Sequence, residues 1–98
     1  MQINVIGKHM EVTEAIRAYA QKKASKLPMH FDRVQSITLR LEQDPQKTSF
    51  HAEVVCDVEK HEDFIGHCHH ADLYHAIDEA VAKVDRQVVA FKEKLKGG

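Results

Sequence analysis

The chain lacks the features that mark membrane and secreted proteins. It has no stretch of about 18 apolar residues, the length at which a helix begins to span a bilayer. The N-terminus has no charged leader followed by an apolar run and a cleavage site, so we expect mature structure and a cytoplasmic location. Two cysteines allow at most one disulfide, and we expect Cys56 and Cys68 to be reduced thiols.

Sequence motifs for catalysis are also lacking. The chain has no Gly-rich phosphate loop, no nucleophile elbow and no HExxH sequence. Neighbouring carboxylates such as Asp78 and Glu79 are better explained as a solvated face than as an acid–base pair. We therefore predict that the protein is not an enzyme and has neither a cofactor nor a small-molecule substrate.

The chain has no excess of positive charge. Its 14 lysines and arginines face 15 acidic residues, so any argument for nucleic-acid binding depends on where the charges lie. Eight histidines make the net charge sensitive to pH, because the unperturbed pKa of histidine is about 6.5. Mild acidification should turn the neutral molecule cationic and tighten its contact with an anionic partner.

Length and composition indicate one soluble domain. The 98 residues are 43% apolar and 30% charged, as in globular proteins, and they contain no internal repeat. A domain of this size buries roughly 65% of its unfolded surface, which is enough for one small core. We expect a single domain over residues 1–96, with residues 97–98 frayed.

Hydrophobic periodicity predicts the secondary structure. Alternating polar and apolar residues are typical of half-buried strands, and apolar residues spaced by three and four are typical of amphipathic helices. Thr13 and Asp72 are the expected N-caps of two helices, and Pro28 is expected to stop the first. The predicted strands are residues 2–6, 34–42, 49–58 and 63–69, and the predicted helices are residues 14–27 and 72–96.

The order β-α-β-β-β-α predicts an α+β fold. The apolar faces of these elements are best buried in a two-layer sandwich, in which both helices cover one face of a four-stranded sheet and the other face is polar. The last two strands form a hairpin. In the last strand we expect a core face of Phe64, Gly66 and Cys68 and an open face of Ile65, His67 and His69.

A cationic flank runs beside the apolar face of the last predicted helix. It is formed by Lys83, Arg86, Gln87 and Lys94. Docking of the helix needs only the apolar face, whereas a cationic stripe on a rigid rod can follow a polyphosphate backbone. If the helices lie side by side, this stripe and a basic stripe on the first helix would border one groove, selective for RNA backbone shape. The stripe of the first helix consists of Arg17, Lys22, Lys23 and Lys26.

The histidines allow an alternative function, a small histidine-rich metal-binding module whose basic stripe only confers solubility. Imidazole and thiolate are good zinc and copper ligands. On a strand, however, His67 and His69 point away from Cys68, so residues 67–70 cannot close one tetrahedral shell. A surface site that combines His67 and His69 with His51 or Glu53 stays open. We predict a solvated polar sheet face rather than a metal site.

Three ordered blocks resemble the ribosome hibernation promoting factors, also called ribosome-associated inhibitors or sigma-54 modulation proteins. The blocks are residues 7–17, residues 26–27 with 31–34, and residues 72–78 leading to Lys83, Arg86 and Gln87. The resemblance covers nearly the full chain. It implies a fold similar to double-stranded RNA-binding domains and a place on the small ribosomal subunit, between head and body. There the protein would overlap messenger and transfer RNA and inhibit translation under stress or in stationary phase.

The resemblance also implies the site residues. Carried over position by position, the family's contacts to ribosomal RNA fall on Lys23, Lys26, Lys83, Arg86, Gln87 and Lys94. Where many relatives carry further basic residues, this chain has Val89 and Ala90, which weakens the middle of the stripe. The chain also lacks the C-terminal dimerisation domain of long members and the tail with which some short members oppose ribosome pairing. We therefore expect a short member that helps a second hibernation factor to pair ribosomes.

Overall fold

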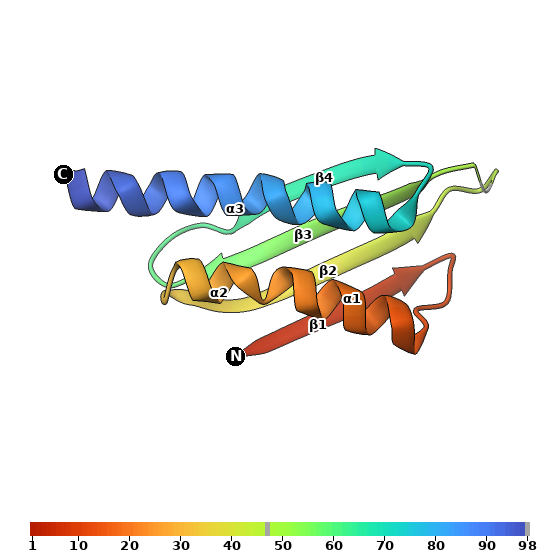
Figure 1. Ribbon diagram of the computed structural model, residues 1–98, viewed down its shortest axis with the longest axis horizontal. Helices are drawn as coiled ribbons and strands as arrows, with labels where there is room; N and C mark the ends of the chain where they lie inside the picture. The colour runs from red at the N-terminus through yellow and green to blue at the C-terminus, as the bar shows by residue number, and fades with distance from the viewer. Residues whose placement is uncertain (47, 98) are drawn as a thin grey trace.

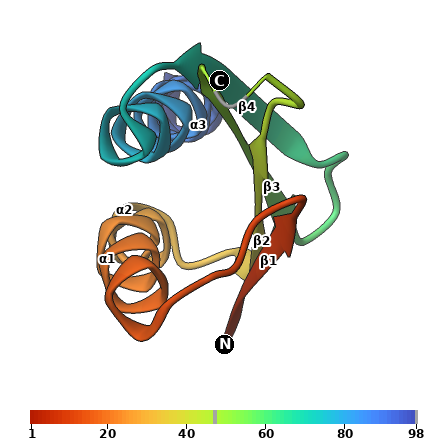
Figure 2. The same cartoon turned by 90° about the vertical axis from the view of Figure 1, so that its right-hand side faces the viewer.

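The protein is a two-layer α+β sandwich, as the sequence predicts (Figures 1 and 2). The computed structural model describes residues 1–46 and 48–97. The strands form one sheet in the order β1-β2-β3-β4, in which β1 is parallel to β2 and the other pairs are antiparallel. The helices cover one face of this sheet (Figure 2). The elements are β1 (Gln2–Lys8), α1 (Glu14–Ala24), α2 (Lys26–His30), β2 (Val34–Gln43), β3 (Phe50–Val58), β4 (Phe64–His70) and α3 (Leu73–Gly97).

The core lies between the sheet and the helices. The two periodicities of the sequence meet there: alternate residues of β2 and β3 point inward, and so does one face of α3. Leu39, Val54 and Ile77 are fully buried. The predicted apolar face of α3 is confirmed up to Val88, whereas Leu95 is 49% exposed. Figure 1 shows the reason, since the last turns of α3 extend beyond the sheet.

The predicted first helix is broken, so its expected end is wrong. Thr13 caps its start as predicted, accepting from the Ile16 amide at 3.2 Å. The chain leaves α1 after Ala24, because the Ser25 hydroxyl donates to the Lys22 carbonyl at 2.7 Å and competes with the helical pattern. Pro28 does not stop a helix but lies in the first turn of α2, where its missing N–H has no intrahelical acceptor to lose.

Several further predictions can be compared with the structure. Asp72 caps α3 by accepting from the Tyr74 amide at 3.0 Å. Both cysteines are free thiols, and burial raises the pKa of the Cys56 thiol to about 11. No helix in the described ranges is long and apolar enough to cross a membrane. Residues 97 and 98 are predicted to be frayed. Gly97 is the last residue of α3, and Gly98 lies outside the described residues.

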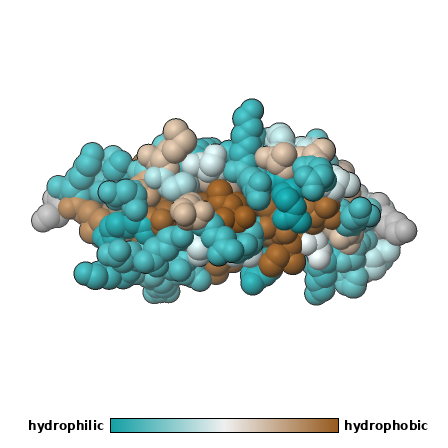
Figure 3. All heavy atoms as spheres, turned by 90° about the horizontal axis from the view of Figure 1, so that it is seen from below, coloured by the Kyte–Doolittle hydropathy of each residue, from teal (hydrophilic) through white to brown (hydrophobic). Residues whose placement is uncertain are grey.

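The Arg17 side chain lies at the edge of the sheet that β1 forms. Seen from below, the molecule shows a hydrophobic strip between hydrophilic margins on the side that carries α1 and β1 (Figure 3). β1 is the outermost strand here, and the Arg17 guanidinium donates to the Val5 carbonyl at 3.3 Å. Charged side chains placed along such an edge discourage further strand pairing.

Gly66 lets α3 pack closely on β4. A Cβ at this position would lie 2.7 Å from the Ala80 carbonyl oxygen and 3.0 Å from side-chain carbons of Lys83 and Val84. The backbone of α3 therefore rests on the middle of β4, where only glycine fits. This close approach sets how α3 and its charged flank lie relative to the strand.

We predict that Gly66→Ala destabilises the fold by about 1–3 kcal/mol, because the added methyl group must push a helix carbonyl away. Chemical denaturation measures the effect. Ile65→Ala, a change to a half-exposed neighbour on the open face, is the control and should cost less. Equal stability of Gly66→Ala and the parent would contradict the close packing.

Candidate RNA-binding surface

A groove runs between α3 and the outer edge of β4. Its volume is about 520 Å³. Two permanent cations, Lys83 and Arg86, stand beside the backbone of the strand there, which makes the groove suitable for an anion. The lining residues are Ile65, Gly66 and His67 from β4 and Lys83, Arg86, Gln87 and Ala90 from α3.

Two of the predicted site residues are held in place by the edge of β4. The Lys83 ammonium donates to the His67 carbonyl at 2.8 Å, and the Gln87 amide donates to the Ile65 carbonyl at 2.8 Å. Because β4 is the outermost strand, these side chains cover carbonyls that another strand could otherwise pair with. An ammonium has three donors, so Lys83 keeps two for a ligand.

Arg86 and Lys94 extend this flank of α3 toward the solvent. Both side chains are exposed, and Arg86 lines the groove directly. A guanidinium presents its donors as a planar fork that matches two phosphate oxygens, whereas an ammonium acts as a point charge. We call the set Lys83, Arg86, Gln87 and Lys94 the cationic edge of α3.

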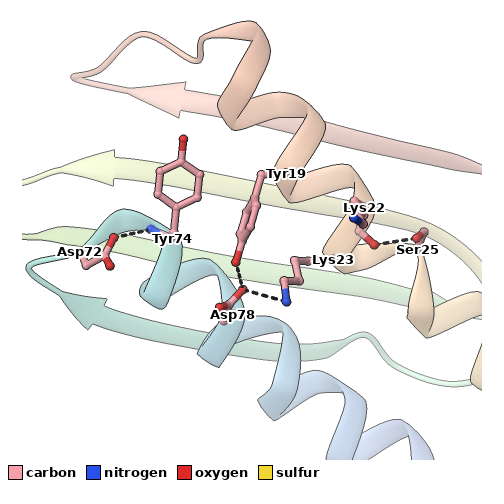
Figure 4. Close-up of polar contacts among 7 residues, drawn as sticks. All are labelled: Tyr19, Lys22, Lys23, Ser25, Asp72, Tyr74 and Asp78. Atoms are coloured by element: carbon pink, nitrogen blue, oxygen red, sulfur yellow. Dashed lines mark hydrogen bonds and ion pairs between the residues drawn. The ribbon is translucent and has the colours of Figure 1, made fainter.

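Lys23, on the first helix, lies in a different environment (Figure 4). Its ammonium is 3.6 Å from Asp78 Oδ1 and 5.5 Å from the centre of the Tyr19 ring. The Tyr19 hydroxyl donates to the same carboxylate oxygen at 2.6 Å. This hydrogen bond, followed by burial, raises the pKa of Tyr19 to about 12. Asp78 therefore connects α1 to α3 and neutralises part of the charge of Lys23.

A second acidic residue of α3 faces α2. His30 Nδ1 lies 2.7 Å from Asp85 Oδ1, and the Lys92 ammonium donates to the His30 carbonyl at 2.9 Å. Asp78 and Asp85 are seven residues apart, close to two helical turns, so they share one flank of α3. The seam between the helices is thus lined with paired carboxylates.

The predicted groove bordered by both basic stripes is therefore wrong. The seam carries Asp78 and Asp85, while Lys83 and Gln87 lie on the opposite flank of α3, against β4. The physical reason is the rotation of α3 about its axis, which is set by its apolar face and by the contact with Gly66. The six predicted residues form two groups: Lys83, Arg86, Gln87 and Lys94 on α3, and Lys23 and Lys26 on α1 and α2.

His67 is a groove residue that the sequence reasoning did not include. The strand pattern placed its side chain on the open face, as observed, but its carbonyl and its position in the groove depend on the packing of α3 on β4. In the part of the chain that the structure describes, no group of three or more His, Cys, Asp and Glu side chains could hold a metal ion. The metal-binding alternative has no support from this geometry.

Comparison with known proteins extends the resemblance. The family described as Sigma 54 modulation protein / S30EA ribosomal protein matches residues 3–96. The ribosome hibernation promoting factor of Azotobacter vinelandii is 36% identical over 95 residues, which cover 96% of this chain and 85% of that protein. The protein of the same name from Escherichia coli K12 is 33% identical over 99 residues, or 98% of each chain.

Solved structures give the same result. The N-terminal domain of Protein Y from Thermus thermophilus has a TM-score of 0.83 at 34% identity and covers 93% of this chain and 99% of its own. A ribosomal subunit interface protein from Coxiella burnetii has a TM-score of 0.84 over 95% of this chain and 99% of its own; at 17% identity it shows the fold alone. The family match spans almost the whole sequence, and the two ribosome hibernation promoting factors exceed 30% identity. The chain therefore belongs to the Sigma 54 modulation protein / S30EA ribosomal protein family.

Proposed function

We propose that this protein is a ribosome hibernation factor. It binds the small ribosomal subunit in the channel used by messenger and transfer RNA and inhibits translation there by occupancy, under stress or in stationary phase. The relatives named ribosome hibernation promoting factor, together with family membership, support the ribosomal role. The observation that carries the RNA-binding part is the cationic edge of α3.

The cationic edge suits an RNA backbone because it lies on a helix that is fixed by packing. Val84 and Val88 bury the helix against the sheet, so the cations on its flank keep their spacing. Lys83 and Lys94 are separated by about 16 Å along the helix at 1.5 Å per residue. Cations held at fixed positions neutralise successive phosphates and release their counterions, and this electrostatic term supplies much of the affinity for nucleic acids.

The individual residues contribute differently to the proposed interface. Arg86 offers a bidentate contact to phosphate, and Lys83 offers the two donors that β4 leaves free. Lys26, half-buried at the start of α2, adds charge on the other side of the seam, whereas Lys23 adds less because Asp78 already accompanies it. The mechanism requires no bound cofactor and no chemical step, since occupancy of the channel is sufficient.

Pairing of ribosomes with the help of a second hibernation factor is part of the same proposal. It rests on the resemblance to short members of the family; the relatives named ribosome hibernation promoting factors support the hibernation role alone. Ribosome profiles from cells with and without the protein test it, because pairing moves ribosomes to a heavier peak.

Co-sedimentation with purified small subunits tests the binding site. If four to six phosphates are neutralised, log affinity should fall with log salt at a slope of roughly −4 or steeper. Initiator transfer RNA should compete, because the proposal places both in one channel. A flat salt dependence, or binding that is indifferent to the transfer RNA, would contradict this placement.

We expect Arg86→Ala to weaken binding to small subunits by about 1–3 kcal/mol, the range for a charge-assisted contact. The melting temperature should not change, because Arg86 is exposed and carries no core packing. Lys8→Gln, which removes an exposed cation from the opposite edge of the sheet, is the matched control. Equal affinity of Arg86→Ala and the parent would remove Arg86 from the interface.

Asp78→Asn should have the opposite effect on binding. The amide oxygen still accepts from Tyr19, but the carboxylate charge that accompanies Lys23 is lost. We expect affinity to rise by up to about fivefold, since exposed pairs are worth roughly 0.2–1 kcal/mol. The pKa of Tyr19 should fall below about 12, as spectroscopic titration can measure. Unchanged affinity would show that the seam does not face RNA.

A further inference from the structure

The open face of the sheet carries a cluster of three imidazoles. His51 of β3 is paired with His69 of β4 across the strands, and their rings stack with centroids 4.2 Å apart. His51 Nε2 also lies 3.4 Å from His67 Nδ1. We call His51, His67 and His69 the histidine cluster.

The histidine cluster adjoins the cationic edge of α3. His67 connects the two, because its carbonyl accepts from Lys83 while its ring lies beside His51. It also lines the groove together with Arg86. Positive charge can therefore continue from α3 around the outer edge of β4 onto the open face.

The charged pairs next to the cluster cancel, so its net charge depends on its imidazoles. The facing carboxylates are already paired, Glu53 with Arg40 at 3.1 Å and Glu42 with Lys8 at 3.9 Å. The charges of these four groups sum to zero, so protonation of an imidazole would give this part of the surface a net positive charge. The other ionisable groups around it are Asp57, at the far end of β3 opposite Ser36, and Glu79, Lys83 and Arg86 on the β4 flank of α3.

We propose that the RNA-binding surface continues around β4 onto the histidine cluster, so that RNA phosphates are held by permanent cations on one side of this strand and by protonated imidazoles on the other. The inference rests on the proposed function and extends its surface. The ligand chemistry is the same phosphate backbone, now with an affinity set by pH.

Proton linkage gives the sign of the effect. Burial, followed by the neighbouring His69 and His67, lowers the pKa of His51 in the free protein. Phosphate beside the cluster favours the protonated form of His51 and raises its pKa. Binding therefore takes up protons, and affinity increases as the pH falls through the range between the lower free and higher bound pKa values.

The test compares binding to purified small subunits at pH 8 and pH 6 at fixed ionic strength. We expect the parent to gain about tenfold in affinity at pH 6, as for a net uptake of one proton over part of this range. The double variant His67→Gln/His69→Gln should gain less than about threefold in affinity between pH 8 and pH 6, measured against its own affinity at pH 8. A matched variant, His9→Asn/His61→Gln, removes two histidines away from the cluster and should keep the parent's full gain.

The outcomes separate this inference from the proposed function. Binding at pH 8 with the same pH dependence in the parent and His67→Gln/His69→Gln overturns the inference and leaves the proposed function standing. Loss of the gain in the matched variant also overturns it, since the effect would then be a general one of net charge. Absence of saturable binding at both pH values overturns both. Circular dichroism checks that each variant is folded.

Discussion

The close packing of α3 on β4 at Gly66 determines the geometry of the whole surface. Without a side chain at this position, the helix backbone comes near enough for Lys83 and Gln87 to reach the carbonyls of His67 and Ile65. The same contacts cover the outer edge of the sheet and align one flank of the helix beside it. Stability, protection of a strand edge and presentation of cations thus depend on one helix–strand contact.

A protein with a formal charge of −1 can present a cationic surface because two carboxylates of α3 are paired on the flank away from β4. Asp78 and Asp85 face the other helices, where they are paired with Lys23 and His30. Lys83 and Arg86 are left on the opposite flank, beside β4. Asp78 and Asp85 therefore hold the helical layer together at a distance from Lys83 and Gln87, so that net charge is a poor guide to binding.

The parts of the structure that follow from local pattern could be predicted. Periodicity gave the strands, the long helix and the faces on which Gly66 and His67 lie, because burial of one face decides these features. The break at Ser25 was missed because a single hydroxyl competes with the helix there. The site residues on α3 were found as a group, but the groove was misplaced. Which flank meets β4 depends on long-range packing, which a helical pattern does not contain.

The histidine cluster lies beside a cationic edge that is weak in its middle. Val89 and Ala90 leave a gap in permanent charge between Arg86 and Lys94. A cluster of imidazoles on the other side of β4, next to Lys83, can supply charge only when protons or phosphates favour it. Permanent cations alone would hold RNA at any pH, whereas a surface of both kinds couples the strength of binding to the proton concentration. Because the cationic edge carries little permanent charge between Arg86 and Lys94, protonated imidazoles then contribute a larger share of the affinity for RNA.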